Sequence, residues 1–325
     1  MKDKKVTLNH GSGGAMMGEL VSGIRKSLEL KGEWEGTLDD SAYLKAGDSY
    51  LVFTTDSYTQ SPYFFPGGDI GKLAVAGTLN DLAVMGARPI ALSLSIIVEE
   101  GFPMKDLEKI ISSANEISKK LNVPIVTGDT KVMPKGQLDS IIINTAGIGK
   151  AEKIIKNENI SQGDSIIVTG SIGDHGAAVL AKRFGYKTDL ISDCTPVIDI
   201  MDMLKDKIKS AKDPTRGGLA ACLNELADKA GVRIVIDEEK IPIKKETRAI
   251  SDVLGIDPMT LACEGRIVFA VSEDDEKETL NILKAEYPDA TVIGTVVEGK
   301  DVILKTRVGE RYLDNPRGEG VPRIC

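Results

Sequence analysis

The stretch from residue 50 to residue 89 decides the fold, because a strand pattern in it is followed by a helix pattern. Residues 50–56, YLVFTTD, are rich in β-branched and aromatic side chains, which predicts a strand. In residues 70–89, IGKLAVAGTLNDLAVMGARP, apolar side chains recur at helical spacing between Leu73 and Ala83, and a glycine and a proline end the pattern. A strand that leads into a helix in this way is typical of α/β chains.

The same alternation runs through the rest of the chain and divides it into two halves. In the first half it predicts further strands at 89–98, 123–129 and 140–149 and a helix at 104–121. In the second half it predicts strands at 164–170, 232–236, 266–271, 291–297 and 301–306 and helices at 176–185, 217–231 and 275–287. We therefore expect an α/β (α+β) fold with two domains, residues 1–150 and 151–306, each a mixed sheet with helices, and a flexible C-terminal tail of residues 307–325.

Composition excludes several classes of function. A formal net charge of -8 argues against nucleic acid as a partner, since phosphate backbones need a basic face. The longest apolar run, IALSLSIIV, is too short to span a membrane, and the first residues lack the apolar core of a signal peptide. We therefore expect a cytoplasmic protein with no membrane partner. The cysteines, Cys194, Cys222, Cys263 and Cys325, form neither a disulfide framework nor a CxxC pair, so any special cysteine acts alone.

Polar clusters rich in Asp, Gly and Ser or Thr lie at the ends of the predicted elements. They are HGSGG (10–14), DDSA (39–42), TTDS (54–57), NDLA (80–83), GDTK (128–131) and DPTRGG (213–218). Glycine turns let backbone N–H groups approach phosphate oxygens, and converging carboxylates repel each other unless a hard cation joins them. The set therefore predicts a site for magnesium and a polyphosphate, although each cluster alone is also what an ordinary turn contains. A Walker A loop and a strand-linked GxGxxG are absent, so the nucleotide site is expected to be of another kind.

Several side chains in or near these clusters allow both a chemical and a structural interpretation. Lys131 in GDTK can neutralise a γ-phosphate or exchange protons, or it can be an ordinary surface lysine. His10 and His175 are the only histidines, and capping or exposed roles are the alternative to catalysis for both. Glu264 in CEGR can act as a base or can form an ion pair with Arg266.

These motifs, in order and nearly from end to end, resemble those of the HypE family of hydrogenase maturation factors, the carbamoyl dehydratases. The resemblance is carried by HGSGG, FTTDSYTQSPYFFPGGDIGKLAVAGTLNDLAVMGARP, VTGDTKV, INTAGIG, GDHGAA, SDC, DPTRGGLA, LNELA, EGR and the final PRIC. The wider superfamily, with aminoimidazole ribonucleotide synthetase, selenophosphate synthetase and thiamine phosphate kinase, shares only the acidic clusters and GGLA. The resemblance implies the two-domain PurM-like fold, in homodimers that bind ATP and magnesium across the paired N-terminal domains.

Carried over residue by residue, the resemblance implies three sets of site residues. Cys325, Lys131 and Glu264 are expected to be catalytic, with His175 and His10 as weaker candidates. ATP is expected to contact Gly11, Ser12, Gly13, Gly14, Thr54, Thr55, Lys72, Asn80, Gly128, Thr130 and Arg216. Mg²⁺ is expected at Asp40, Asp56, Asp81, Asp129 and Asp213. For Arg216, binding a phosphate and pairing with an acid are equally open interpretations.

The resemblance also implies a reaction and its partners. The carbamoyltransferase HypF would load a carbamoyl group on Cys325, ATP would drive its dehydration to a thiocyanate, and the cyano group would pass to iron in a HypC and HypD scaffold complex. The tail of residues 307–325 would reach up to roughly 60 Å when extended, so Cys325 can visit its own active site and a partner. Cys263 departs from the asparagine more usual in the family, which puts the hydrogen bonds beside Glu264 in doubt.

Two other functions remain compatible with the sequence. One is a related ATP-dependent synthetase or kinase that acts on a free small molecule, so its turnover would survive deletion of the tail. The other is a non-catalytic maturation adaptor, in which the tail is a docking peptide and ATP only orders the dimer.

Overall fold

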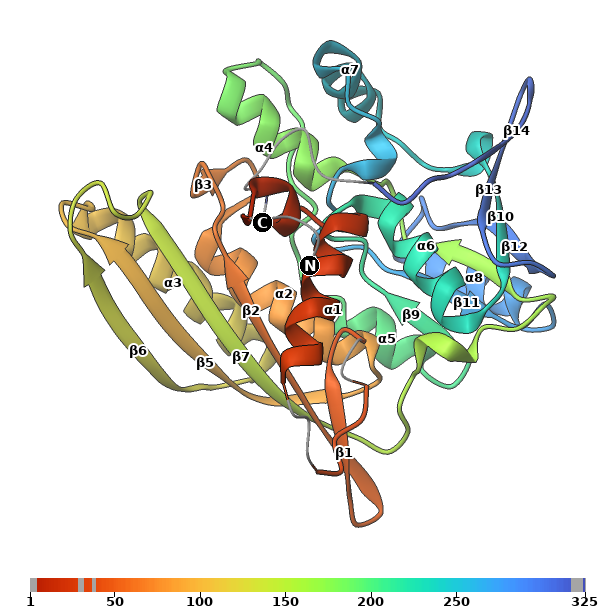
Figure 1. Cartoon of the computed structure of the whole chain (residues 1–325), viewed down its shortest axis with the longest axis horizontal. Coiled ribbons are helices and arrows are strands. Elements are labelled where there is room, and N and C mark those ends of the chain that lie inside the picture. Colours follow the sequence, from red (N-terminus) through yellow and green to blue (C-terminus); the bar gives the residue numbers. More distant parts are fainter. Residues whose placement is uncertain (1–4, 29–31, 37–38, 317–323, 325) are drawn as a thin grey trace.

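The first half of the chain forms a five-stranded sheet with the strand order β1-β2-β7-β5-β6 (Figure 1). Its strands are β1 (Ala42–Ala46), β2 (Ser49–Tyr58), β5 (Arg88–Glu99), β6 (Ile125–Met133) and β7 (Ile141–Ala151). Neighbouring strands are antiparallel except β5 and β6, which are parallel. The computed structural model describes residues 5–28, 32–36, 39–316 and 324.

Helices α2 (Ile70–Val84) and α3 (Met104–Leu121) cover one face of this sheet (Figure 1). Strand β2 turns Val52 and Tyr58 toward the helices, where both are buried, while Phe53 on the opposite face is 40% exposed. Helix α2 is apolar nearly all round, and it is buried nearly all round because it also packs against the second domain. Asp69 begins this helix by accepting hydrogen bonds from the backbone N–H groups of Gly71 and Lys72.

The second half forms a seven-stranded sheet with the strand order β14-β13-β10-β12-β8-β11-β9. Its strands are β8 (Ser165–Val168), β9 (Ser210–Lys212), β10 (Arg233–Asp237), β11 (Val268–Val271), β12 (Thr291–Val297), β13 (Val302–Thr306) and β14 (Gly309–Tyr312). Ile166 and Val168 pack toward α6 (Gly218–Ala230), and Ile167 packs toward α5 (Ile198–Leu204) and α8 (Glu276–Lys284). The central strands are therefore buried on both faces, which is why they read as continuous apolar runs.

Several elements were not expected from the sequence. They are α1 (Gly14–Ser27), α5, α7 (Lys245–Leu254), β1, β9, β14 and the short hairpin of β3 (Phe64–Phe65) and β4 (Gly68–Asp69), whereas the helix predicted at 176–185 is α4 (Asp174–Phe184). The prediction that the tail begins at residue 307 was wrong, because β14 pairs with β13 and extends the sheet. The next residues are also held: the side-chain amide of Asn224 donates to the carbonyl of Leu313 at 2.8 Å, and the N–H of Ala15 donates to that of Pro316 at 2.9 Å.

None of the helices in the described ranges is long and apolar enough to cross a membrane.

Candidate functional site

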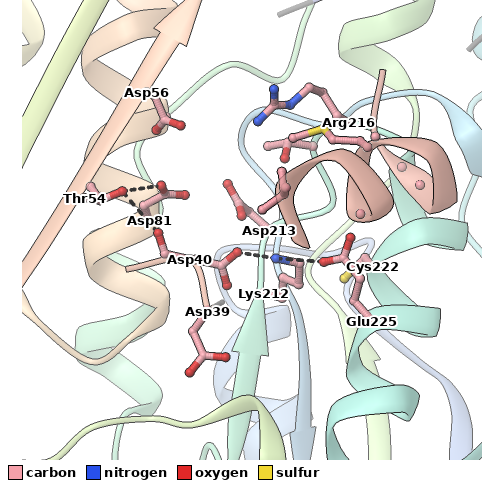
Figure 2. A pocket seen from close by; sticks show the side chains of 18 of the residues that line it. Asp39, Asp40, Thr54, Asp56, Asp81, Lys212, Asp213, Arg216, Cys222 and Glu225 are labelled. Atoms are coloured by element: carbon pink, nitrogen blue, oxygen red, sulfur yellow. Dashed lines mark hydrogen bonds and ion pairs between the residues drawn. The ribbon is translucent and has the colours of Figure 1, made fainter. Parts of the chain in front are cut away.

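A cavity of about 720 Å³ lies between the two domains (Figure 2). The first domain contributes β2 and α2 to its wall, and the second contributes the loop that leads into α6. The N-terminal loop and the first turns of α1 also line it. Its size fits a ligand as large as a nucleotide, because small-molecule sites typically enclose about 300–1,000 Å³.

Three carboxylates converge in this cavity from separate parts of the chain. One oxygen from each of Asp40, Asp81 and Asp213 lies within 4.8 Å of the other two. Asp81 extends from α2 and accepts a hydrogen bond from the hydroxyl of Thr54 on β2 at 2.8 Å. Figure 2 shows Asp56 above this group on the same wall, and Asp56 also lines the cavity. Four of the five aspartates that the sequence assigns to a metal therefore meet at one place.

Burial and mutual repulsion raise the pKa values of two carboxylates in this cluster, Asp81 and Asp213. Burial, and then the charges of Asp56, Asp213 and Asp40, raise the pKa of Asp81 well above its ordinary value. Burial and the charge of Asp40 raise the pKa of Asp213 to about 7, although Lys212 opposes them. Oδ2 of Asp40 is buried without a hydrogen-bond partner among the residues described. A hard divalent cation would satisfy this unpaired oxygen and relieve the repulsion, so the donor set fits Mg²⁺.

Lys212 is a cavity residue that sequence reasoning missed. Its ammonium forms an ion pair with Asp40 and a second one with Glu225 at 3.3 Å (Figure 2). Burial lowers the pKa of Lys212, but the two acids more than offset this and hold it above its ordinary value. Its position directly before Asp213 was the sequence signal for an ion pair, since a lysine next to clustered acids is placed to pair with one of them.

The glycine-rich N-terminal loop packs on the TRGG turn and on the start of the tail. A Cβ on Gly13 would lie 2.7 Å from the backbone of Arg216, and a Cβ on Gly14 would lie 1.9 Å from the carbonyl oxygen of Pro316. Both glycines also have positive φ angles, so only glycine fits at either position. The loop brings the N-terminus of α1 to the cavity beside that of α6, which begins at Gly218. Two helix N-termini at one cavity favour an anionic ligand.

The other residues assigned to ATP divide into those that reach the cavity and those that do not. Thr54, Thr55 and Arg216 line it, together with Gly13 and Gly14. Asn80 is fully buried, and its side chain binds the backbone at Val197, Thr195 and Glu264. Four predicted ATP-binding residues are not among the described residues that line the cavity: Gly11, Ser12, Lys72 and Asn80. The ammonium of Lys72 donates to the carbonyl of Gly67 at 2.9 Å.

The GDTK segment lies on β6, at the edge of the first sheet and outside the cavity. Gly128, Asp129, Thr130 and Lys131 are all exposed, and Asp129 and Lys131 form an ion pair at 2.9 Å. The strand register places Asp129 in one row with Ser95, Asn144 and Ser57. Because Ser57 lines the cavity, Asp129 stands about 14 Å from it, three strand spacings away. One chain therefore does not bring Lys131 to the acidic cluster.

The remaining catalytic candidates lie in three different settings. Glu264 lines the cavity, and its Oε1 is buried without a partner in the described part of the chain. Burial and the charges of Asp213 and Asp193 raise the pKa of Glu264 well above its ordinary value. His10 is half-buried, and its Nδ1 bonds to the backbone N–H and the hydroxyl of Thr7. His175 is fully buried beside Ile324, and Cys325 lies outside the described residues.

Comparisons with known proteins agree with this geometry. Residues 38–151 match the family model of the AIR synthase related protein, N-terminal domain, and residues 161–307 match that of the C-terminal domain. The chain is 42% identical to carbamoyl dehydratase HypE of Rhizobium leguminosarum bv. viciae over 99% of its own length and 95% of that protein. It is similar to a chain of a solved HypE–HypF complex, with a TM-score of 0.85 and 41% identity, covering 91% of this chain and 99% of that one. A solved structure of HypE in complex with ATP matches with a TM-score of 0.82 and 36% identity over 99% of this chain and 100% of that one.

Proposed function

The chain belongs to the HypE family of carbamoyl dehydratases, enzymes of hydrogenase maturation, and we propose that it dehydrates a carbamoyl group carried on its own Cys325. The product would be a thiocyanate on the same sulfur, a source of cyanide ligands for the iron of a NiFe-hydrogenase. The observation that carries the proposal is the acidic cavity. It joins a set of converging carboxylates with two helix N-termini and with Glu264, a buried group able to take up a proton.

We propose that the cavity binds ATP with Mg²⁺, and the solved complex of a relative, HypE, with ATP supports the nucleotide. The carboxylates of Asp40, Asp81 and Asp213 would hold the cation, with Asp56 beside them. When bound, the cation would neutralise the phosphate oxygens during phosphoryl transfer. Gly13 and Gly14 would bring backbone close to the phosphates at the start of α1, and Arg216 would add a positive charge.

The residues of the chain must then manage one phosphate and two protons. The carbamoyl oxygen attacks the γ-phosphorus, so a C–O–P bond forms and the bond to ADP breaks. The carbamoyl nitrogen loses two protons and the C–O bond breaks to release phosphate. A triple bond forms between the carbon and the nitrogen, and the carbon stays bound to sulfur. Glu264 is the candidate base for one proton, since its raised pKa means that it holds a proton firmly once it has taken it. Lys131 is the candidate for the other proton or for orienting the carbamoyl group.

Cys325 would act as a carrier that moves between this cavity and a second protein. A solved complex pairs a relative, HypE, with HypF, and we propose that the carbamoyltransferase HypF loads Cys325. A scaffold of HypC and HypD would receive the cyano group. The chain is anchored as far as Pro316, so the nine residues 317–325 set the reach of the sulfur, at most about 30 Å. A tethered substrate faces its site at a high effective concentration, which favours transfer in both places.

We propose that the working unit is a homodimer joined through the uncovered face of the first sheet. Phe53 and Ile148 are paired across β2 and β7 on this face and are 40% and 37% exposed. The same register places Lys131 on this face, at the open edge. A second copy packed here would cover the apolar side chains and the edge strand β6, which are otherwise costly to leave in water. It would also carry its own Lys131 toward the first copy's cavity.

A shared site predicts that two inactive variants restore each other. Lys131→Ala and Glu264→Gln should each lower dehydration strongly, because each removes one proton-handling group. Co-expressed with different tags and purified on both tags, they should recover about half of wild-type activity, since each mixed dimer keeps one intact site of two. The measurement is dehydration rate in the doubly purified mixed dimer. A mixed dimer no more active than either parent would show that each chain builds its site alone.

A further inference from the structure

The one described residue near the end of the chain, Ile324, lies in a seat formed by both domains. Its side chain is 3% exposed and belongs to the same apolar cluster as Tyr58, Phe65 and Cys194. Tyr58 also lines the acidic cavity. The apolar cluster that holds Ile324 therefore extends to the wall of the cavity through Tyr58.

His175 binds the backbone of Ile324 inside this seat. The Nε2 of His175 donates a hydrogen bond to the carbonyl oxygen of Ile324 at 2.7 Å. The imidazole is fully buried, at the first turn of α4, and lies nearly perpendicular to the ring of Phe65, with centroids 5.1 Å apart. A backbone carbonyl buried in an apolar seat needs a donor, because leaving it unpaired is costly.

The carbonyl of Ile324 determines which nitrogen of His175 carries the proton, and Ser192 satisfies the other nitrogen. Its hydroxyl lies 2.8 Å from Nδ1, and the same hydroxyl oxygen accepts the N–H of Cys194 at 3.0 Å. Because the carbonyl of Ile324 can only accept, Nε2 must carry the hydrogen, so the hydroxyl of Ser192 donates to the lone pair of Nδ1. Burial also lowers the pKa of His175 to about 4, so the ring is neutral at physiological pH.

These contacts leave His175 no free nitrogen for chemistry. One nitrogen donates to the tail and the other accepts from Ser192, while proton transfer needs a nitrogen directed at the reacting group. We propose that His175 and Ser192 form a neutral dock for the tail, holding Ile324 so that the adjacent Cys325 is presented to the acidic cavity. His175 is then a positioning residue, and its effect on the reaction rests on the proposed function.

The dock can be tested by digestion of the tail with a carboxypeptidase. After Cys325 is removed, the release of Ile324 requires that it leave its seat, so the rate reports the undocked fraction. His175→Phe keeps a ring of similar shape but cannot donate, and we expect release about tenfold faster than in the wild type. Ser192→Ala should also speed release, because it leaves the buried Nδ1 of His175 without the hydroxyl that holds the ring in place. His175→Gln restores a donor at the position of Nε2 and should stay within about twofold of wild type.

Thr279→Val is a matched control, since Thr279 is a fully buried polar residue on α8, away from the seat. It should leave tail release unchanged, and thermal melting should confirm that all variants are folded. Single-turnover dehydration of the carbamoylated chain should fall about tenfold in His175→Phe and recover in His175→Gln, with ATP affinity unchanged in both.

Tail release within twofold of wild type in both His175→Phe and Ser192→Ala would overturn the dock, as would a folded His175→Gln as defective as His175→Phe. The digestion needs neither ATP nor a carbamoyl group, so it separates the two proposals. If release responds as expected but the wild-type chain never dehydrates, the proposed function fails and the dock stands.

Discussion

Cys325→Ala is expected to abolish the ATP turnover that the chain shows in the presence of the transferase and carbamoyl phosphate. If the sulfur of Cys325 carries the substrate, its removal leaves the cavity with ATP and nothing to phosphorylate. Tethering gives the carbamoyl group a large effective concentration at the cavity, so a free carbamoyl compound should not replace it. The rate of ATP turnover should therefore fall by more than about a thousandfold. The measurement is phosphate release with and without carbamoyl phosphate.

Cys263→Ser is the matched control for this loss. The sulfur of Cys263 is fully buried and accepts the N–H of Gly173 at 3.0 Å, a contact that a serine hydroxyl can keep. Coupled phosphate release should therefore stay within about threefold of wild type. Equal coupled turnover in Cys325→Ala and the wild type would instead indicate an enzyme that acts on a free small molecule.

Asp81→Asn is expected to lower dehydration about a thousandfold while it stabilises the cation-free protein. The neutral amide keeps an oxygen that can accept from Thr54, but it removes one charge from the cation site and one source of repulsion. The sign follows from the raised pKa of Asp81, which burial and its acidic neighbours cause. A carboxylate with a raised folded-state pKa costs no stability below its unfolded pKa, and the cost grows as pH rises toward the folded pKa.

Melting temperatures in EDTA at pH 5 and pH 8 measure this effect. At pH 8, Asp81→Asn should melt several degrees above the wild type, which corresponds to about 1 kcal/mol in the free energy of unfolding. The gain in melting temperature should be smaller at pH 5. Added Mg²⁺ should raise the melting temperature of the wild type far more than that of the variant. A variant that is less stable than the wild type at pH 8 in EDTA would contradict the electrostatic interpretation.

Asp164→Asn serves as the opposite control. Asp164 is buried too, but it accepts from the ammonium of Lys209 and the N–H of Ser161, both at 2.8 Å. Loss of its charge breaks an ion pair rather than a repulsion, so this variant should be destabilised and should keep its dehydration rate.

The sequence predicted most of the sheet and helix order because local periodicity records which face of an element is buried. The runs at 50–56 and 70–89 became β2 and α2 as expected. Strand β14 was missed because its four residues, GERY, are all exposed and carry no apolar pattern. Helix α1 was missed for a related reason: it begins within the glycine-rich loop that suggested irregular structure.

The candidate site was predictable in its chemistry but not in its membership. The aspartates at 40, 56, 81 and 213 meet because strand and helix ends from both domains face one cavity, and turn composition signals such ends. Asn80 has the same sequence signal, yet its side chain links α2 to the backbone of the second domain. Which side of α2 faces the cavity depends on how the domains pack, and no local pattern contains that information.

The acid-rich motifs did not predict the positive charge of Lys212 in the cavity. Lys212 neutralises Asp40 inside the cluster, so the cavity carries less negative charge than its aspartates suggest. The GDTK motif on β6 differs in the opposite way. Its sequence resembles the other site motifs, but within one chain Lys131 lies at the open edge of the first sheet, away from the cavity. The proposed second copy of the chain would reconcile the motif with its place, because it would bring Lys131 to the cavity of its partner.

The measurement that tests the self-carrier chemistry most directly is the intact mass of the chain, first loaded by the transferase with carbamoyl phosphate and then given ATP and Mg²⁺. The expected result is one carbamoyl group gained in the first step and one water lost in the second, with both changes on the peptide that contains Cys325. A non-hydrolysable ATP analogue should leave the carbamoyl adduct intact. A carbamoyl adduct that persists with ATP, or ATP consumption with no change in the mass of that peptide, would contradict dehydration on Cys325.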